Sequence, residues 1–274
     1  MARRRSVTLR VHTHWAAPVR IIRSPRLVRL SAFTAGTLAL TGVAVVAPSA
    51  AVAATAGPAF VQQVSAHAGG GGSLSVTPSA VLGAGDRLVV QVGVWNSAHA
   101  TTSTVTDAAG DAFTEVSHFA AADGTEQSVW TAPITTGAGT KPAIKATPTS
   151  AADIGIAAVE YSGLSTATGT AAVDSQAHAV GHTGSTTPAT VASGATTATT
   201  ATNELAVGFY TDSGFGDTLT PGTGYTARVT VAPTADMELL TEDQLVPAGA
   251  TPNATVNTGA NTYWLMTTIT FKTG

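Results

Sequence analysis

Short apolar runs separated by turn residues fill the chain from about residue 59 onward. The run over 153–164, D-I-G-I-A-A-V-E-Y-S-G-L, places apolar or very small residues on both faces of an extended strand. The run over 87–95, R-L-V-V-Q-V-G-V-W, has the same property. A segment that is apolar on both faces is typical of an inner strand covered on both sides. We therefore expect both runs to be central strands.

About a dozen further alternating or β-branched runs follow, separated by turns such as Asp107–Asp111, and none has helical periodicity. This pattern predicts an all-β protein with two packed antiparallel sheets, either jelly-roll-like or immunoglobulin-like. We expect a flexible start and a first strand over 55–72, with Gly69–Gly72 as a flexible spacer. One β-sandwich domain is expected over 73–274, with no internal repeat. The Thr/Ala/Gly/Ser-rich region 165–202 indicates either edge strands or a loose connection.

The first 54 residues have the organisation of an export signal. Residues 1–29 are basic, Leu30–Ala47 is uncharged and apolar, and Ala51-Val52-Ala53 has the small-x-small pattern that signal peptidase accepts. We expect cleavage after Ala53 or Ala54. The alternative is an uncleaved membrane anchor, because the apolar stretch is near the length of about 18 residues that a span needs.

Charge is divided sharply between the two parts of the chain. The part beyond residue 54 holds all 16 acidic residues and only five basic ones, which gives a formal charge of −11. An acidic body argues against a nucleic-acid partner, which requires clustered Lys and Arg. The absence of cysteine excludes disulfides, thiol nucleophiles and Cys-ligated zinc.

A family resemblance rests on five motifs that follow one another along the chain. They are T-V-T-D-A-A-G-D-A-F-T at 104–114, V-W-T-A at 129–132, V-E-Y-S-G-L at 159–164, N-E-L-A-V-G-F at 203–209 and I-T-F-K at 269–272. Their order resembles a module of secreted bacterial proteins that occurs beside immunoglobulin-like, fibronectin-like and carbohydrate-active domains. The resemblance implies a non-catalytic β-sandwich that is extracellular or surface-associated.

Catalytic signatures are not evident in the sequence. The chain has no G-x-S-x-G motif, although a catalytic triad on a β scaffold is recognised by geometry and not by sequence. Glu238, Glu242 and Asp243 are close in sequence, and we interpret them as a solvated strand face. Five histidines lie beyond the basic segment, and we interpret them as exposed loop residues: His67, His99, His118, His178 and His182. We therefore predict no catalytic residue and no metal ligand among these groups, and favour a protein that is not an enzyme.

Two binding hypotheses remain open. Asp107 and Asp111 flank a glycine turn and offer oxygens to calcium, although we favour the alternative of an Asx-type turn between two strands. Tyr210, Phe215 and Tyr225 bracket a glycine-rich loop, and sugar rings stack on such aromatic faces. The alternative is that these rings belong to the core, since a chain with few aromatics needs its large side chains inside.

These observations predict an exported, non-catalytic β-sandwich protein for surface association, adhesion or glycan binding. A secreted hydrolase acting on polysaccharide and a structural surface or assembly subunit are the alternatives. We expect the protein to be secreted or at the cell surface. A glycan is the expected partner, and contact with a membrane is expected only through the signal segment if it is retained.

Overall fold

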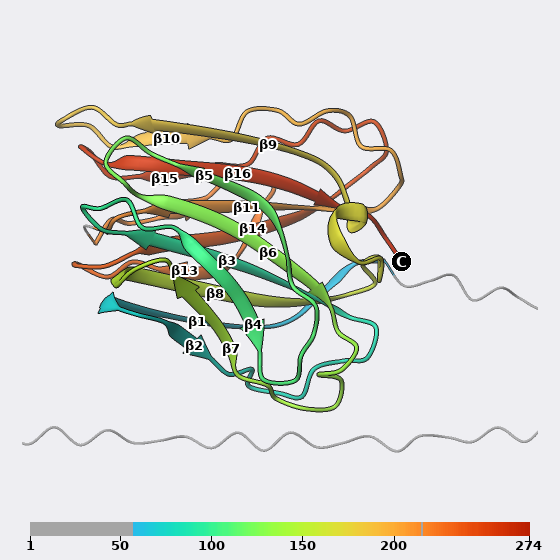
Figure 1. The fold of residues 1–274 in the computed structure, drawn as a ribbon. Coiled ribbons are helices and arrows are strands. Elements are labelled where there is room, and N and C mark those ends of the chain that lie inside the picture. The colour runs from blue at the N-terminus through green and yellow to red at the C-terminus, as the bar shows by residue number, and fades with distance from the viewer. Residues whose placement is uncertain (1–56, 215) are drawn as a thin grey trace, which may run out of the picture. The chain divides into compact units, whose positions relative to one another are not determined.

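The computed structural model describes residues 57–214 and 216–274 (Figure 1). The predicted export segment at 1–54 and Phe215 lie outside these residues. The described part of the chain forms sixteen strands and one short 3-10 helix, and every pair of named strands is antiparallel. The predicted all-β antiparallel class is therefore confirmed. Within these residues we find no helix with the length and hydropathy needed to cross a membrane.

The strands fall into two consecutive sets of eight, which we call the first half and the second half. The first half contains β1 (Ala59–Gly71), β2 (Leu74–Val76), β3 (Arg87–Trp95), β4 (Thr102–Asp107), β5 (Thr114–Ala120), β6 (Glu126–Pro133), β7 (Ile144–Pro148) and β8 (Ala152–Ser162). After the 3-10 helix η1 (Gly169–Ala172), the second half contains β9 (Val173–His182), β10 (Ala189–Ala192), β11 (Glu204–Asp212), β12 (Thr220–Pro221), β13 (Thr226–Val231), β14 (Glu238–Val246), β15 (Thr255–Thr258) and β16 (Tyr263–Phe271).

The two halves have the same strand order. Each contains a five-stranded inner sheet, β1-β8-β3-β6-β5 in the first half and β9-β16-β11-β14-β13 in the second. Each also contains a three-stranded outer sheet, β2-β7-β4 in the first half and β10-β15-β12 in the second. Adding eight to every strand number of the first half gives the second. The fold is thus an internal duplication with four sheets, whereas the sequence analysis predicted two sheets and no repeat.

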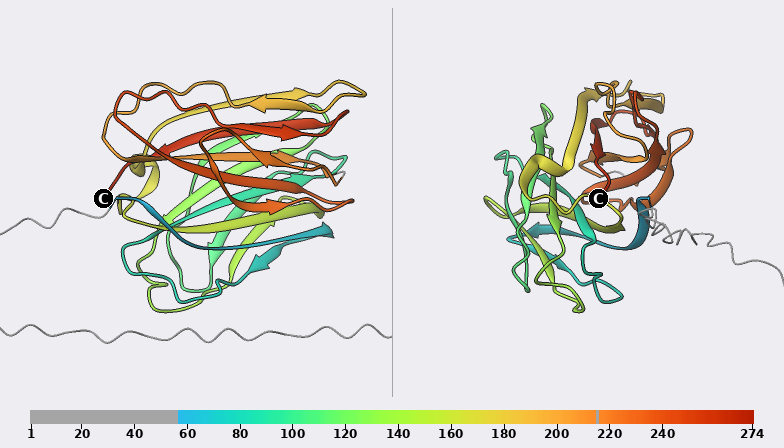
Figure 2. Two further views of the ribbon diagram at one scale, coloured as in Figure 1. Left: turned by 180° about the vertical axis from the view of Figure 1, so that it is seen from behind. Right: turned by 90° about the vertical axis from the view of Figure 1, so that its right-hand side faces the viewer.

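The four sheets are stacked, as the ribbon in Figure 2 shows. Three apolar cores lie between them. One core lies between each outer sheet and the inner sheet of the same half, and the third lies between the two inner sheets. Representative buried residues are Val90, Ile144 and Ile156 in the first half, Val89, Phe209 and Leu239 between the halves, and Tyr210, Val256 and Met266 in the second half. The inner strands β3 and β8 are therefore covered on both faces, as their sequence pattern predicts.

Gln91 on β3 is a buried polar residue in the layer between the halves. Its Nε2 donates to the backbone carbonyl of Tyr210 at 2.6 Å and to Thr211 Oγ1 at 2.9 Å. Its Oε1 accepts a hydrogen bond of 2.7 Å from Thr241 Oγ1. Both ends of the amide are satisfied, so burial carries no penalty for an unpaired polar group.

Gln127 on β6 repeats this arrangement beside Gln91. Its Nε2 donates to the carbonyl of Phe209 at 3.1 Å and to Thr211 Oγ1 at 2.8 Å. Its Oε1 accepts from Thr267 Oγ1 at 2.7 Å. Two glutamines of the first half thus bond to backbone and threonine groups of the second.

Arg87 binds the segment that connects the two halves. It is fully buried, and its Nε donates to the carbonyl of Ser165 at 2.8 Å while its guanidinium also bonds to Ala167 O and Thr131 Oγ1. Burial lowers the pKa of Arg87 to about 10. The start of the 165–202 region is therefore held by the first half, and the rest of that region includes η1, β9 and β10. Gly69 to Gly71, three of the four glycines in the predicted spacer, belong to β1.

Candidate functional site

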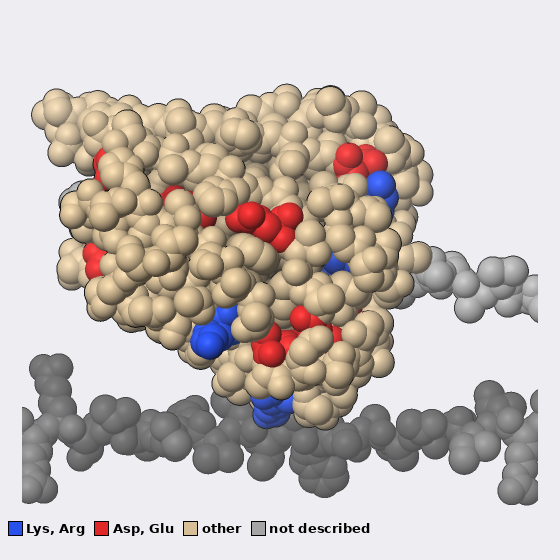
Figure 3. All heavy atoms as spheres, viewed as in Figure 1, with Lys and Arg blue, Asp and Glu red and all other residues tan. Residues whose placement is uncertain are grey.

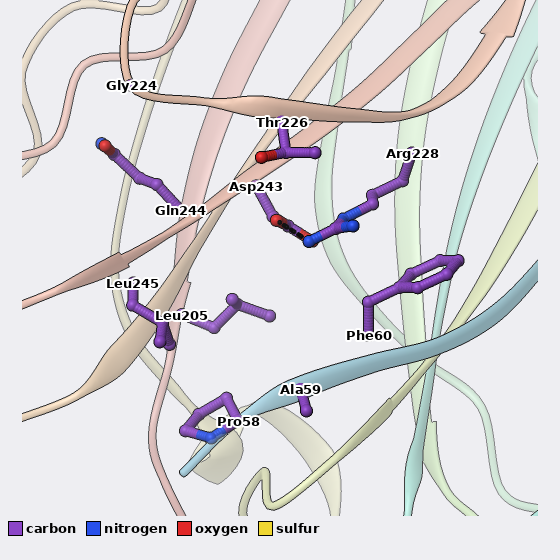
Figure 4. Close-up of a pocket in the computed structure, with 10 residues that line it drawn as sticks. All are labelled: Pro58, Ala59, Phe60, Leu205, Gly224, Thr226, Arg228, Asp243, Gln244 and Leu245. Carbon is purple, nitrogen blue, oxygen red and sulfur yellow. Dashed lines mark hydrogen bonds and ion pairs between the residues drawn. The ribbon is translucent and has the colours of Figure 1, made fainter. Parts of the chain in front are cut away.

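An open groove lies along one edge of the stack, where β1 of the first half meets β13 and β14 of the second. Its volume is about 510 Å³. Figure 4 draws the residues that line it. The lining residues come from the start of β1 and from the second half: Pro58, Ala59, Phe60, Leu205, Gly224, Thr226, Arg228, Asp243, Gln244 and Leu245. The groove therefore combines residues from both halves.

Arg228 is the central polar group of the groove. It lies at an irregularity in the pairing of β13 with β14, between Ala227 and Val229, and such a bulge changes the direction of the side chain. Its Nε and one terminal nitrogen donate to the two oxygens of Asp243 at 2.8 and 2.9 Å. Figure 4 shows this pair beside the ring of Phe60, whose centroid is 4.6 Å from the Arg228 Cζ atom.

Electrostatics around the ion pair favour its charged form. Hydrogen bonding to Asp243 raises the pKa of Arg228 above its usual value. Tyr161 is buried behind the groove, with its ring 6.3 Å from that of Phe60 in an edge-to-face arrangement. Burial and the neighbouring Asp243 raise the pKa of the Tyr161 hydroxyl well above its usual value, so this phenol stays neutral.

The exposed surface of the groove is partly apolar. Phe60 is 36% exposed and Leu245 is 55% exposed, while Thr226 and Gln244 add a hydroxyl and an amide. Within the described lining, Asp243 is the one carboxylate, and it is already paired with Arg228. The groove can therefore bind a ligand through one apolar face and several hydrogen-bonding groups, but it does not present the two facing carboxylates that a glycosidase needs.

Of the aromatic residues proposed from the sequence, the two that the structure describes, Tyr210 and Tyr225, do not form a common exposed surface. Tyr210 is fully buried in the core between the inner and outer sheets of the second half, and its hydroxyl donates to Asp212 Oδ2 at 2.6 Å. Tyr225 is half-buried and packs against the same core. Phe215 lies outside the described residues. Tyr210 therefore corresponds to the core alternative, and Tyr225 lies next to the groove only through its neighbours Gly224 and Thr226.

The prediction of a solvated carboxylate face on β14 is wrong. Glu238 and Glu242 are fully buried and Asp243 is 4% exposed, because sheets cover both faces of this inner strand. Burial raises the pKa of Glu242 to about 7, and Gly222 N donates to its Oε2 at 2.8 Å. Burial also raises the pKa of Glu238. Glu238 and Glu242 are therefore buried polar groups, and Asp243 is the one of the three that lines the groove.

Asp107 and Asp111 are engaged by backbone amides. Asp107 Oδ1 accepts from the amides of Ala109, Gly110 and Asp111 itself at 2.6 to 3.0 Å. Asp111 accepts from the amides of residues 135, 136 and 137. This geometry is that of the Asx-type turn considered as the alternative to calcium binding.

The histidines are exposed, as predicted, but four of the five lie on strands and not in loops. His67 is on β1, His118 on β5, and His178 and His182 on β9. Two groups of the described chain bring metal-ligand atoms within 4.8 Å of one another: Glu115, His118 and Glu126, and Asp212, Asp217 and Glu238. The sequence analysis missed both groups because their members are separated along the chain. Strand pairing joins the first group and also places Asp212 opposite Glu238, while Asp217 comes from the segment between β11 and β12.

Sequence signals for the groove are weak. Phe60 belongs to an alternating run that predicts a strand, but nothing in that run tells which face remains open. Arg228 is one of five basic residues beyond residue 54, and this rarity was the only signal that could have drawn attention to it. Comparisons with family models, with curated proteins and with solved structures give no match to this chain.

Proposed function

We propose that this chain is an exported, non-catalytic β-sandwich protein that binds glycans at the groove between β1 and β13, at the cell surface or outside the cell. The proposal takes each half to be a jelly roll, since eight strands in two sheets with this order match that architecture. Jelly rolls occur in lectin domains, but a fold alone does not define an activity.

The observation that carries the proposal is the composition of the groove. A sugar ring has an apolar C–H face and a rim of hydroxyl groups. Phe60 and Leu245 supply exposed apolar surface, and the planar groups of Arg228, Asp243 and Gln244 supply donors and acceptors beside it. Such a combination of an apolar surface with a few placed polar groups is typical of a small-ligand site.

A glycan array and a pulldown with insoluble polysaccharides test this proposal. The purified full chain is compared with Phe60→Ala and with Tyr263→Ala, a matched control whose ring is exposed to a similar extent on β16. We expect retention on one class of glycan, a loss of about tenfold in affinity for Phe60→Ala and no change for Tyr263→Ala. Equal retention of both variants contradicts the proposed site, and no retention on any glycan contradicts the function.

A structural or assembly subunit is a second candidate function. The exposed apolar residues Val61 on β1 and Val180 on β9 lie on edge strands of the two inner sheets, where another chain can add a strand. Most of the face that Figure 3 shows carries neither Lys or Arg nor Asp or Glu. Sedimentation over a range of protein concentrations distinguishes the two functions, since assembly requires self-association and glycan binding does not.

A further inference from the structure

A histidine and two glutamates lie close together at one edge of the inner sheet of the first half. This edge is opposite to the edge that β1 forms. Glu115 and His118 are on β5, the edge strand, and Glu126 is the first residue of β6. In the β5–β6 ladder Glu115 pairs with Trp130, and His118 pairs with Ser128. The irregularity between Glu115 and Ser117 gives both β5 side chains the same face of the sheet as Glu126.

Glu126 is the group that needs an explanation. Its side chain is fully buried, and Oε2 accepts a hydrogen bond of 3.0 Å from Thr102 Oγ1. Its Oε1 has no hydrogen-bond partner among the described residues. An unpaired carboxylate oxygen inside a protein is destabilising, and a bound cation is one way to compensate it.

The unpaired oxygen points to His118. Glu126 Oε1 is 3.6 Å from His118 Nε2, which is too long for a good hydrogen bond. Zinc binds imidazole nitrogen at about 2.0–2.1 Å and carboxylate oxygen at about 2.0–2.2 Å, so a separation of this size fits one ion between them at an angle of about 120°.

Glu115 completes the group. Its Oε1 is 3.0 Å from His118 Nδ1, and donor atoms of the three residues all lie within 4.8 Å of one another. Like Glu126 Oε1, Glu115 Oε1 is buried and has no hydrogen-bond partner among the described residues. A carboxylate beside the second ring nitrogen of a metal-binding histidine usually orients the imidazole.

We propose that Glu115, His118 and Glu126 form a binding site for a divalent transition-metal ion, with zinc as the best fit. Imidazole together with carboxylates suits zinc, whereas calcium and magnesium prefer oxygen ligands alone. His118 is 37% exposed and borders a depression of about 280 Å³ that also contains Gln176 and His178. Solvent can therefore fill the remaining coordination positions, so the site is open on one side.

Isothermal titration of zinc into the chelator-treated full chain tests the site. His12 and His14 in the basic segment are other potential zinc ligands, so all measurements use a background in which both are replaced by alanine. We expect one ion per chain. We also expect His118→Ala and Glu126→Gln each to weaken zinc binding at least tenfold, because each removes one ligand. Cobalt in place of zinc should give visible absorption that the same variants lose.

His67→Ala is the matched control. His67 is an exposed histidine on a strand with a carboxylate oxygen of Asp236 at 3.0 Å, but it belongs to neither metal-capable group. Its loss should leave zinc affinity unchanged. Absence of zinc binding in the background protein overturns the proposal, as does equal affinity in His118→Ala. If Glu126→Gln fails to fold, the His118→Ala variant still tests the proposal, because His118 is an exposed residue.

Discussion

The two halves share a strand order and an edge irregularity, yet they differ in chemistry at that edge. In the first half the irregularity in β5 falls at Val116, and in the second the one in β13 falls at Arg228. Both halves begin their sixth strand with a fully buried glutamate, Glu126 in β6 and Glu238 in β14. The duplicated backbone therefore places equivalent positions at two edges of the molecule.

The side chains at these equivalent positions have diverged. His118 pairs with the residue two positions after Glu126, and Thr230 pairs with the residue two positions after Glu238. Glu115 pairs with the residue four positions after Glu126, and Ala227 pairs with the residue four positions after Glu238. Glu115 and Ala227 are therefore equivalent positions as well. The proposed metal ligands are thus confined to the first half, while the ion pair of the proposed glycan groove is confined to the second. One scaffold can therefore carry two different sites at one repeated position.

Truncation of the core between the halves should have the largest effect. Phe209→Ala removes a fully buried ring from the layer that both inner sheets share. We expect a loss of about 3–5 kcal/mol in the free energy of unfolding. Because both halves contribute to this core, urea unfolding should remain one transition. Two separate transitions would show that the halves are independent domains and would break the comparison.

The pH dependence of stability should come from both halves. Burial raises the pKa of Glu126 to about 8 and that of Glu242 to about 7, from 4.5 in the unfolded chain. The folded state binds the extra proton, so this stabilisation is complete below pH 4.5 and is lost as the pH rises toward 7 to 8. We expect the free energy of unfolding to fall between pH 5 and 8, by up to about 1.4 kcal/mol per pH unit for each group.

Glutamine substitutions separate these two contributions. Glu126→Gln should flatten the decline up to pH 8, and Glu242→Gln should flatten it up to pH 7, because neither amide titrates. The measurement is urea unfolding at pH 5, 6, 7 and 8 without added metal. Unchanged slopes in both variants would contradict the assignment.

A methyl group added between the two inner sheets should have an intermediate effect. Gly155 on β8 faces Met237 and Leu239, and a Cβ atom there would lie 3.0 Å from Met237 Cβ. Gly155→Ala should therefore cost about 1–3 kcal/mol through overpacking. Gly184→Ala is the control, since its added Cβ meets no atom within 4 Å. Equal stability of the two variants would mean that the two inner sheets can move apart at this position without a loss in the free energy of unfolding.

Making the second edge resemble the first should have the smallest effect. Arg228→Val gives β13 the residue type that β5 has at its irregularity and leaves Asp243, which is 4% exposed, without its cation. We expect a loss of about 1 kcal/mol, since Arg228 is partly exposed and solvent screens the pair. Thermal unfolding beside the double variant with Asp243→Asn measures the coupling. A loss above about 3 kcal/mol would contradict the screened-pair interpretation.

The sequence was informative about individual strands and uninformative about their assembly. The two-sided apolar pattern of β3 and β8 predicted inner strands, and it did so because residues such as Val89 and Val90 are buried on opposite faces. The same pattern shows that a strand is covered on both faces but does not tell which sheets cover it. Four stacked sheets were therefore interpreted as two. The duplication was missed because strand order is set by pairing, and pairing leaves no fixed period in these residues.

The candidate sites were predicted less well for a related reason. Glu238 and Glu242 lie on the same face of one strand. An alternating sequence pattern does not tell whether that face is covered by water or by a further sheet. His118 and Glu126 are separated by a turn and become neighbours only through the β5–β6 ladder. The loop after Tyr210 suggested a ligand surface as an alternative to the core, and its own strand places the ring in the core.

The polar residues between the two inner sheets influence whether a first half pairs with a second half or with another first half. Halves with one strand order offer similar faces, so pairing of a first half with another first half is the natural competitor. Gln91 and Gln127 are both contributed by the first half, and their amides are satisfied by Thr211, Thr241 and Thr267 of the second. Like-with-like pairing would bury glutamines without these partners. The duplicated chain thus contains a built-in penalty against the pairing of like halves from two molecules.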